Sequence, residues 1–518
     1  MIFGWIGGKM GAAIKGPQMY ERNHLIHRLR AACIGKEDVV FADVLGGNPV
    51  TFGALFAGAE RMAAALVSLG VQPGDRVAVQ VEKTIEAVQL YLGTVMAGGV
   101  FLPLNTAYTP PEVAYFLNDA TPAVVICDPS KLAAVGVVSK GAKLGTLDAD
   151  GLGSFVELSE EFQRFEPVSR SADDLAAILY TSGTTGRSKG AMLSHNNLLS
   201  NSETLREYWH FTADDVLIHA LPIFHTHGLF VATNVALLAG ASVIFMARFD
   251  ADEIIKSMPR ATALMGVPTF YTRLLKDTRL DLQCVANMRL FISGSAPLLV
   301  ETHEQWEQRT GHRILERYGM TETNMSTSNP YDGARRAGTV GMPLPGVEAR
   351  IISDNQQVAD GEIGVLHVRG SNVFQGYWQM PTKTAEELLP DGWFITGDLA
   401  KRDTDGYITI VGREKDLVIS GGFNIYPKEI ESLIDDISGV TESAVIGVPH
   451  PDLGEVVVAV VVANATTITP EHIGAQLQGK LAKFKQPKSV ILVPELPRNT
   501  MGKVQKKSLR ETYAELFQ

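Results

Sequence analysis

Short apolar runs alternate with longer helix-like stretches along most of the chain. The apolar runs are rich in valine, isoleucine and leucine and have the length of buried strands; they lie at residues 76–81, 124–127, 241–245 and 290–293. Residues 84–96 and 112–117 between them favour helices. Such an alternation is typical of layered α/β folds with largely parallel sheets. The pattern predicts an α/β fold, and no internal repeat divides it.

The pattern changes near residue 412, where we place a domain boundary. A turn-forming stretch at 403–406 precedes Gly412-Arg413-Glu414-Lys415. The roughly one hundred residues that follow contain strand-like runs at 443–448, 456–462 and 489–493 and two or three helices, enough for a small α+β domain. We therefore predict a large domain at 19–414 and a small domain at 415–518.

The N-terminus fits neither domain. Residues 1–18 contain Lys9 and Lys15, several glycines and no acidic residue. Their apolar runs are short and no clear cleavage site follows, which favours a loose extension, or a start codon set before the true start at Met19, over a targeting segment. We predict a loose extension at 1–18.

Composition narrows the class of protein and of partner. The chain has 518 residues, of which 45% are hydrophobic and 20% charged, as expected for a globular protein of about three domain-sized units. A net charge of −11 gives no basic field for nucleic acid or anionic lipid, and no apolar stretch has membrane-spanning length. The three cysteines are widely spaced and suit a reducing compartment, so we expect a cytoplasmic protein that acts on small molecules.

A glycine-rich loop carries the clearest candidate chemistry. An apolar run at 175–179 leads into Tyr-Thr-Ser-Gly-Thr-Thr-Gly-Arg-Ser-Lys-Gly at 180–190. Glycines allow backbone N–H groups to approach an anion, while the hydroxyls and Lys189 add donors and a positive charge. The spacing differs from the Walker pattern. The loop indicates a polyphosphate cradle, although loops of this composition also serve as flexible linkers.

Further candidate sites follow in a fixed order. The first is Arg317-Tyr318-Gly319-Met320-Thr321-Glu322-Thr323, which offers a hydroxyl to a phosphate and a carboxylate to a metal, or simply an N-cap. Asp398 follows a glycine turn and can accept hydrogen bonds from a ribose diol, or form an Asx-turn. The last are a Gly-Arg pair at 412–413, a Ser-Gly-Gly run at 420–422 and a Gly-Lys pair at 502–503.

In this order the motifs resemble the adenylate-forming superfamily of acyl-CoA synthetases, adenylation domains and luciferases, from about residue 43 onward. The resemblance implies ATP, Mg²⁺ and coenzyme A as cofactors and co-substrates, and Lys503, Thr321 and Glu322 as catalytic residues, with Glu322 as the metal ligand. It also implies ATP-binding roles in the phosphate loop, the adenine wall and the ribose contacts; these fall on Thr181, Ser182, Gly183, Thr184, Thr185, Gly186, Lys189, Gly294, Ser295, Ala296, Pro297, Glu316, Arg317, Tyr318, Asp398 and Arg413.

The resemblance further implies a mobile C-terminal domain. In that family a carboxylate attacks the α-phosphate of ATP, and a thiol then displaces AMP from the acyl-adenylate. The small domain rotates between the two half-reactions, with Lys415 at the hinge position. Rotation would withdraw Lys503 and bring Ser420, Gly421 and Gly422 to the site as the CoA-binding backbone.

The acyl pocket leaves more than one reading open. Its expected residues are His225, Thr226, Arg273, Ser295 and Met325. Arg273 would suit a second carboxylate through paired hydrogen bonds, or would be a surface arginine, and Arg289 is the rival cation. The runs at 178–197, 220–230, 317–329 and 496–506 are similar to bacterial malonyl-CoA synthetases, which implies malonate as substrate and methylmalonate as a weaker one.

Three alternatives stay open at this level. A fully apolar pocket would favour a synthetase for acetate, propionate or another short monocarboxylate. A stand-alone adenylation module would load a carrier protein, although no carrier-like segment follows Lys503. A non-catalytic binder is disfavoured by the joint presence of Glu322, Asp398, Arg413 and Lys503. We expect no nucleic-acid, membrane or obligate protein partner.

Overall fold

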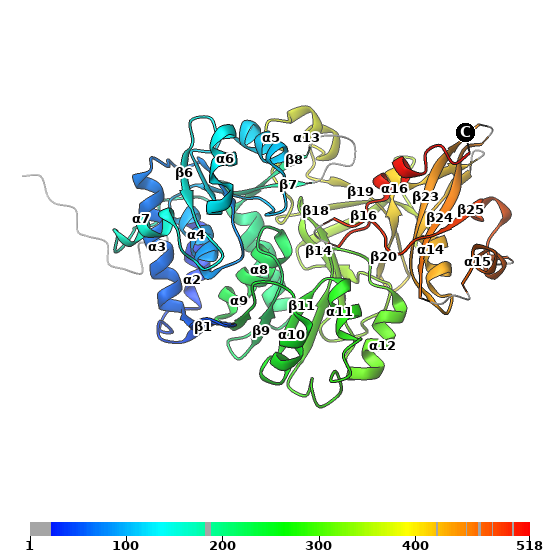
Figure 1. Cartoon of the computed structure of the whole chain (residues 1–518), viewed down its shortest axis with the longest axis horizontal. Coiled ribbons are helices and arrows are strands. Elements are labelled where there is room, and N and C mark those ends of the chain that lie inside the picture. The colour runs from blue at the N-terminus through cyan, green and yellow to red at the C-terminus, as the bar shows by residue number, and fades with distance from the viewer. Residues whose placement is uncertain are drawn as a thin grey trace, which may run out of the picture.

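The structure is a computed structural model that describes residues 22–181, 188–420, 423–451, 453–464, 468–478, 480–499 and 502–517. The elements from α2 to β20 form a large body, and β23, β24, β25 and α15 gather at the opposite end of the molecule (Figure 1). The predicted extension at 1–18 lies outside the described residues.

The first sheet of the large body has the strand order β6-β5-β3-β4-β7-β8. Its strands are β3 (Arg76–Gln80), β4 (Val100–Pro103), β5 (Val124–Cys127), β6 (Lys143–Thr146), β7 (Leu175–Thr181) and β8 (Lys189–Ser194). They pair in parallel except β7 and β8, which form an antiparallel pair on either side of the glycine-rich loop. Buried strands with covered faces explain the near-continuous apolar runs in the sequence.

The second sheet has the order β15-β14-β13-β12-β11-β9-β10-β1-β2. Its strands are β1 (Val40–Val44), β2 (Val50–Thr51), β9 (Val216–His219), β10 (Ser242–Phe245), β11 (Ala263–Gly266), β12 (Leu290–Ser293), β13 (Leu315–Met320), β14 (Asn324–Ser328) and β15 (Met342–Pro343). The strands from β1 and β10 to β13 are parallel, and both ends of the sheet add antiparallel strands.

Helices cover both sheets, and most of them share the main apolar core, whereas the helices at 110–120 and 132–138 pack on the first sheet in a second apolar cluster. They are α2 (His24–Ala31), α3 (Phe52–Ser68), α4 (Ile85–Met96), α5 (Pro110–Ala120), α6 (Leu132–Val138), α7 (Ser154–Glu160), α8 (His195–Tyr208), α9 (Asn234–Ala239), α10 (Ala251–Ser257), α11 (Pro268–Leu274), α12 (Val300–Thr310) and α13 (Pro381–Glu387), with a π-helix at His227–Thr233. Helix α4 illustrates how local sequence determines where a helix begins and which side chains it buries. Thr84 caps its N-terminus by accepting a hydrogen bond from the N–H of Ala87, and nearly all of its side chains are buried.

A third sheet is antiparallel and has the order β17-β16-β18-β19-β20. Its strands are β16 (Val347–Ser353), β17 (Gln356–Gln357), β18 (Gly364–Gly370), β19 (Phe394–Arg402) and β20 (Ile408–Arg413). The expectation of largely parallel sheets holds for the first two sheets and is wrong for this one. Antiparallel strands are joined by short turns rather than crossover helices, so alternation with helices gives no signal for them.

The C-terminal elements form a separate sheet with its own apolar clusters. The order β22-β21-β24-β23, with β25 on β24, joins β21 (Val418–Ser420), β22 (Phe423–Ile425), β23 (Val440–His450), β24 (Gly454–Ala463) and β25 (Ser489–Leu492). The helices α14 (Pro427–Asp435), α15 (Pro470–Leu477) and α16 (Lys506–Thr512) accompany it. The mixed α/β fold, with a large N-terminal and a small C-terminal part, is confirmed.

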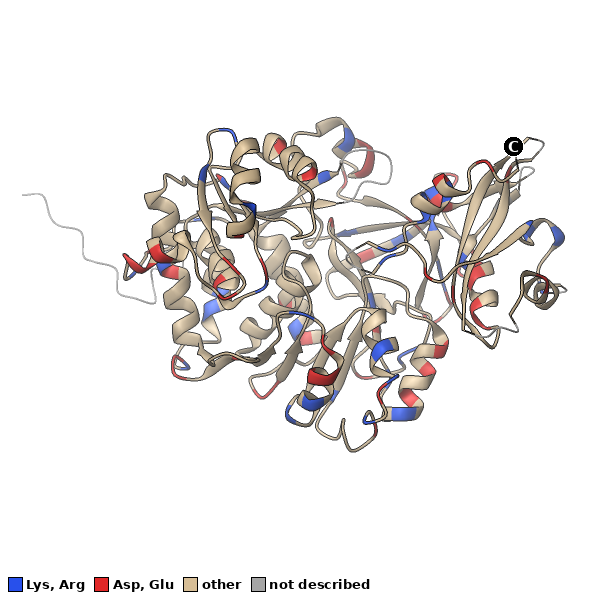
Figure 2. Ribbon diagram, in the orientation of Figure 1, with Lys and Arg blue, Asp and Glu red and all other residues tan. Residues whose placement is uncertain are grey.

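Charged residues are distributed over both parts. In Figure 2, basic and acidic segments are interspersed along the ribbon at both ends of the molecule. Within the described ranges, no helix has the length and apolar character needed to cross a membrane.

Candidate active site

Three strands bring together the residues expected at the ribose. The carboxylate of Asp398 on β19 accepts a hydrogen bond from the Tyr318 hydroxyl on β13 at 2.6 Å and pairs with Nε of Arg413 on β20 at 2.9 Å. Asp398 and Arg413 are cross-strand partners in the antiparallel sheet, and Asp398 is only 4% exposed. The arrangement brings the side chains of Tyr318, Arg413 and Asp398 together.

Glu322 lies in the turn between β13 and β14 and is 4% exposed. The Tyr377 hydroxyl contacts its Oε1 at 3.0 Å, and burial raises the pKa of its carboxyl group. A buried carboxylate with so few partners fits a hard divalent cation such as Mg²⁺. No cluster of three or more His, Cys, Asp or Glu side chains in the described part could hold a metal. A magnesium ion here would therefore be held by Glu322 and by phosphate oxygens of a bound nucleotide.

Two residues of this site, Tyr377 and Glu387, were not predicted from the sequence. Nζ of Lys189 lies 3.1 Å and 3.2 Å from the two carboxylate oxygens of Glu387 at the end of α13, and 4.1 Å above the Tyr377 ring. The Tyr377 hydroxyl also contacts Glu387 at 2.6 Å. Tyr377 thus bridges Glu322 to the partner of Lys189. A contact across 198 residues between a helix-end glutamate and a loop lysine follows no local pattern, and the Gly-Tyr pair at 376–377 was the only available hint.

The centre of the glycine-rich loop is outside the described residues. This applies to Ser182, Gly183, Thr184, Thr185 and Gly186, whose roles stay predictions. Its flanks are described: Thr181 ends β7 and Lys189 begins β8, and the two residues face each other across the antiparallel pair. The loop therefore begins and ends at the carboxyl edge of the first sheet.

Lys503 reaches this region from the small domain. It follows Gly502, whose φ of 76° suits a residue without a β-carbon, and its N–H donates to Oδ1 of Asn499 at 2.9 Å. A β-carbon on Gly502 would lie 3.7 Å from Thr269 of α11, so the turn lies against the large domain. Lys503 as a residue is exposed, but desolvation of its ammonium group lowers its pKa, and the charge of Arg413 lowers it further.

Charged groups of the large domain act on the Lys503 ammonium group. Besides Arg413 they include the carboxylates of Asp398 and Glu322, which raise its pKa. Lys503 in turn helps to lower the pKa of His225, which burial already brings to about 3. The cation from the small domain therefore lies within electrostatic range of the candidate nucleotide site of the large one.

The residues expected around the acyl group come from three segments. Thr226 and His227 are buried at the start of the π-helix, Ser295 follows β12 with a φ of 72°, and Met325 lies buried on β14. Oγ of Ser295 is 3.4 Å from Nδ1 of His227. Nδ1 of His225, in turn, lies 3.4 Å from the His227 backbone N–H. The segments expected around the acyl group thus contribute polar atoms as well as a methionine.

The two candidate arginines have different surroundings. Arg289 holds Asp215 with two contacts of 2.7 Å and donates to two backbone carbonyls, so its charge is already paired. Arg273 is exposed on α11, with its guanidinium 5.5 Å from the Phe249 ring centre. Its role on a second carboxylate stays a prediction.

The remaining predicted residues occupy the walls and the hinge. Gly294, Ala296 and Pro297 follow β12 beside Ser295, and the buried Glu316 contacts His303 at 3.2 Å and accepts from the N–H of Gly338 at 3.2 Å. Thr321 lies in the turn before Glu322, and Lys415 is exposed in a short 3-10 turn after β20. Ser420 ends β21 and is buried; Gly421 and Gly422 lie outside the described residues.

Comparison with known families agrees with this geometry. Residues 29–378 match the family described as AMP-binding enzyme, and residues 429–503 match the AMP-binding enzyme C-terminal domain. The chain belongs to the AMP-binding enzyme family. It is therefore an adenylate-forming enzyme, as the order of its motifs predicted.

Similar proteins narrow the position of this AMP-binding enzyme within its family. It is 36% identical over 480 residues to the malonate–CoA ligase of Arabidopsis thaliana, covering 86% of this chain and 79% of that protein. The crystal structure of ATP-bound MatB from Rhodopseudomonas palustris is 58% identical, with a TM-score of 0.92 over 95% of this chain and 99% of that one.

The apo crystal structure of the same MatB gives a lower TM-score of 0.81 at 57% identity, over the same 95% of this chain and 99% of that one. The AMP-binding enzyme described here is thus closer in overall arrangement to the ATP-bound form. This agrees with the electrostatic influence of Asp398, Glu322 and Arg413 of the large part on Lys503 of the small one.

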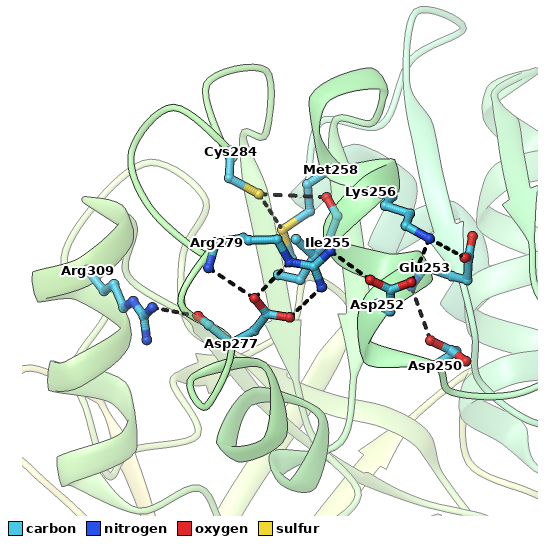
Figure 3. Close-up of polar contacts among 10 residues, drawn as sticks. All are labelled: Asp250, Asp252, Glu253, Ile255, Lys256, Met258, Asp277, Arg279, Cys284 and Arg309. Atoms are coloured by element: carbon cyan, nitrogen blue, oxygen red, sulfur yellow. Dashed lines mark hydrogen bonds and ion pairs between the residues drawn. The ribbon is translucent and has the colours of Figure 1, made fainter.

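A second charged cluster in this AMP-binding enzyme has a different character. Around Arg279, exposed side chains from α10 and the segment after α11 pair with one another (Figure 3). Hydrogen bonds from Arg279 lower the pKa of Asp277 to about 2. The charges of this cluster are thus paired with one another, and exposed pairs of this kind contribute little to stability.

Proposed function

We propose that this enzyme joins malonate to coenzyme A with the conversion of ATP to AMP and pyrophosphate. In the first half-reaction a malonate carboxylate oxygen attacks the α-phosphorus of ATP, and the bond to the β-phosphate oxygen breaks. In the second, the CoA sulfur attacks the carbonyl carbon of malonyl-AMP, and AMP leaves with the bonding electron pair. The adenylate is needed because a free carboxylate would have to expel an oxide ion, which is far too basic a leaving group for attack by a thiol.

The observation that carries this proposal is that Lys503 lies within electrostatic range of Asp398, Glu322 and Arg413. These residues come from the small domain, from two strands of the antiparallel sheet and from the turn after β13. A cation held at that point offsets the charge that develops when a carboxylate oxygen approaches a phosphate. It also orients the two reacting groups, which lowers the entropic barrier.

The other residues hold the nucleotide in place. Asp398 and Arg413 would bind the ribose hydroxyls, and the Tyr318 ring would pack against the adenine. Glu322 would hold Mg²⁺, which supplies charge neutralisation for the departing pyrophosphate when it is bound. Lys189 and the loop at 181–189 would surround the outer phosphates, with the Tyr377–Glu387 pair fixing the position of Lys189.

The second half-reaction would require the small domain to turn about Lys415. Lys415 lies in the short segment that joins β20 to β21, between the two sheets. The turn would remove Lys503 from the cleft and bring the segment at 420–422 to it, where a backbone with small side chains leaves room for the pantetheine arm. A cytoplasmic location, where ATP and CoA are available, is part of this proposal.

Malonate is supported by the 58% identity to MatB and by the polar lining around Ser295, His227 and Thr226. The test is a CoA-thioester assay with acetate, propionate, malonate, methylmalonate and succinate, with AMP and pyrophosphate as readouts. We expect the highest kcat/KM for malonate, a lower one for methylmalonate, and a one-to-one yield of AMP and thioester. A higher kcat/KM for propionate or acetate would refute the malonate assignment.

A further inference from the structure

Lys83 is a buried lysine that the proposed reaction does not use. It follows β3 of the first sheet and is 7% exposed. Its Nζ lies 2.9 Å from Nδ1 of His219, donates to the His219 backbone carbonyl at 2.7 Å, and is 4.5 Å from the centre of the Phe245 ring. Burial lowers the pKa of the amine well below its usual value, yet even a neutral amine has a hydrogen for each of these acceptors. Lys83 therefore ties the first sheet to the end of β9 in the second.

His219 extends this contact to the π-helix. Its Nε2 lies 3.0 Å from the carbonyl oxygen of Gly228 and 3.1 Å from the Thr233 hydroxyl, which itself donates to that carbonyl at 3.0 Å. Burial lowers the pKa of His219 well below its usual value, and the charge of Lys83 lowers it further, so the imidazole is neutral at pH 7. A neutral ring with its proton on Nε2 donates to Gly228 and accepts from Lys83 through Nδ1.

The bond from the imidazole to Gly228 closes the loop at 220–227. The chain returns on itself so tightly that a β-carbon on Gly228 would lie 2.0 Å from the carbonyl oxygen of Pro222, an approach that only glycine permits. Within the loop, Oγ1 of Thr226 and Nε2 of His227 are buried and have no hydrogen-bond partner. Because no bond holds these two atoms, the positions of both side chains depend on how the loop is closed.

We propose that Lys83 and His219 are positioning residues, which hold the loop at 220–227 in the conformation that the acid requires. This inference rests on the proposed function, which assigns that loop to the acyl group. The two residues would act through the carbonyl of Gly228 and not by contact with the acid. A small displacement of groups that face a substrate can lower the rate strongly. The candidate nucleotide residues lie on other strands, β13, β19 and β20, so the effect should be confined to the acid.

The test compares Lys83→Met with Lys83→Gln in steady-state assays. Both new side chains are unbranched, uncharged and of similar length, but only glutamine can donate to Nδ1 and to the carbonyl of His219. For Lys83→Met we expect kcat/KM for malonate to fall about 10-fold, while the ATP KM stays within about twofold. Lys83→Gln should keep kcat/KM for malonate within about threefold of the wild type. The opposite ranking, with methionine harmless and glutamine harmful, would indicate a packing role and overturn the proposal.

Thr233→Val probes the same closure with a nearly isosteric change. It removes a hydroxyl that donates to Gly228, and we expect kcat/KM for malonate to fall about 3- to 5-fold. Thr94→Val is the matched control, because the Thr94 hydroxyl is buried in α4 and donates to the Leu90 carbonyl at 2.7 Å. It should lower the free energy of unfolding in urea to a similar extent but change kcat/KM by no more than about twofold. Equal falls in kcat/KM for both variants would assign the effect to general destabilisation and contradict the proposal.

Malonate and propionate are assayed in parallel, so that this inference and the proposed function fail separately. A wild-type enzyme that prefers propionate would refute the malonate assignment, and the variants measured with propionate would then decide the role of Lys83. If Lys83→Met does not fold, Thr233→Val and its control decide it. An unchanged kcat/KM for the preferred acid in the folded variants would refute the inference, as would an equally large rise in the ATP KM.

Discussion

Replacing Lys503 by alanine should separate the two half-reactions. Lys503 of the small domain lies within electrostatic range of Asp398, Glu322 and Arg413 of the large one. At about 4 Å and an effective dielectric constant of about 20, one cation stabilises one added negative charge by about 4 kcal/mol. Because the Lys503 side chain is exposed, water screens part of that energy. We expect malonyl-AMP formation to slow by about 10²- to 10³-fold.

The assay follows each half-reaction separately. Malonate-dependent pyrophosphate release measures the first, and thioester formation from supplied malonyl-AMP and CoA measures the second, which should change by no more than about threefold. Lys507→Ala is the matched control, since Lys507 is an exposed lysine four residues away whose side chain lies 3.8 Å from Glu511. An equal loss of both half-reactions would refute the assignment of Lys503 to adenylation alone.

Two further predictions concern the supports of the site and of the fold. Tyr377→Phe removes the hydroxyl that bridges Glu322 and Glu387. We expect the Mg²⁺ concentration for half-maximal adenylation to rise about 5- to 10-fold, while the malonate KM stays unchanged. An unchanged Mg²⁺ titration would contradict this prediction. His195 is fully buried and accepts a hydrogen bond from the Leu25 N–H, and burial lowers its pKa to about 3 from an unfolded value of 6.5. Below pH 6.5 only the unfolded chain takes up this proton, so the free energy of unfolding decreases as the pH is lowered. In urea unfolding, the decrease between pH 6.5 and pH 5.5 should be about 1 kcal/mol smaller for His195→Gln than for the wild type. An equal decrease in both proteins would contradict this prediction.

The sequence predicted the elements whose signal is local. The run at 124–127 is β5, and the run at 290–293 is β12, because short apolar segments bounded by turn residues are buried strands of parallel sheets. The helix predicted at 84–96 differs from α4 by one residue at its start, where Thr84 is the cap rather than the first helical residue. The antiparallel sheet from β16 to β20 was not foreseen, because its strands have no helices between them to mark their direction.

The site was predictable in part for the same reason. Asp398, Glu322 and Lys503 belong to short motifs in a fixed order, and the structure brings them within electrostatic range of one another. Glu387 was missed, since its contact with Lys189 depends on how distant segments pack. The partners of Arg289 and of Lys83, and the burial of Arg317 in the middle of β13, are also properties of packing. No spacing along the chain reveals whether an arginine meets an aspartate in the folded protein.

The most direct test of the account follows oxygen from the acid into the nucleotide. Malonate labelled with oxygen-18 in both carboxylates is incubated with ATP, Mg²⁺, CoA and the enzyme, and the masses of the products are measured by mass spectrometry. If malonate attacks the α-phosphorus and CoA then displaces AMP, one labelled oxygen per turnover appears in AMP and the pyrophosphate is unlabelled. Label in inorganic phosphate, accompanied by ADP, would contradict the formation of an acyl-adenylate.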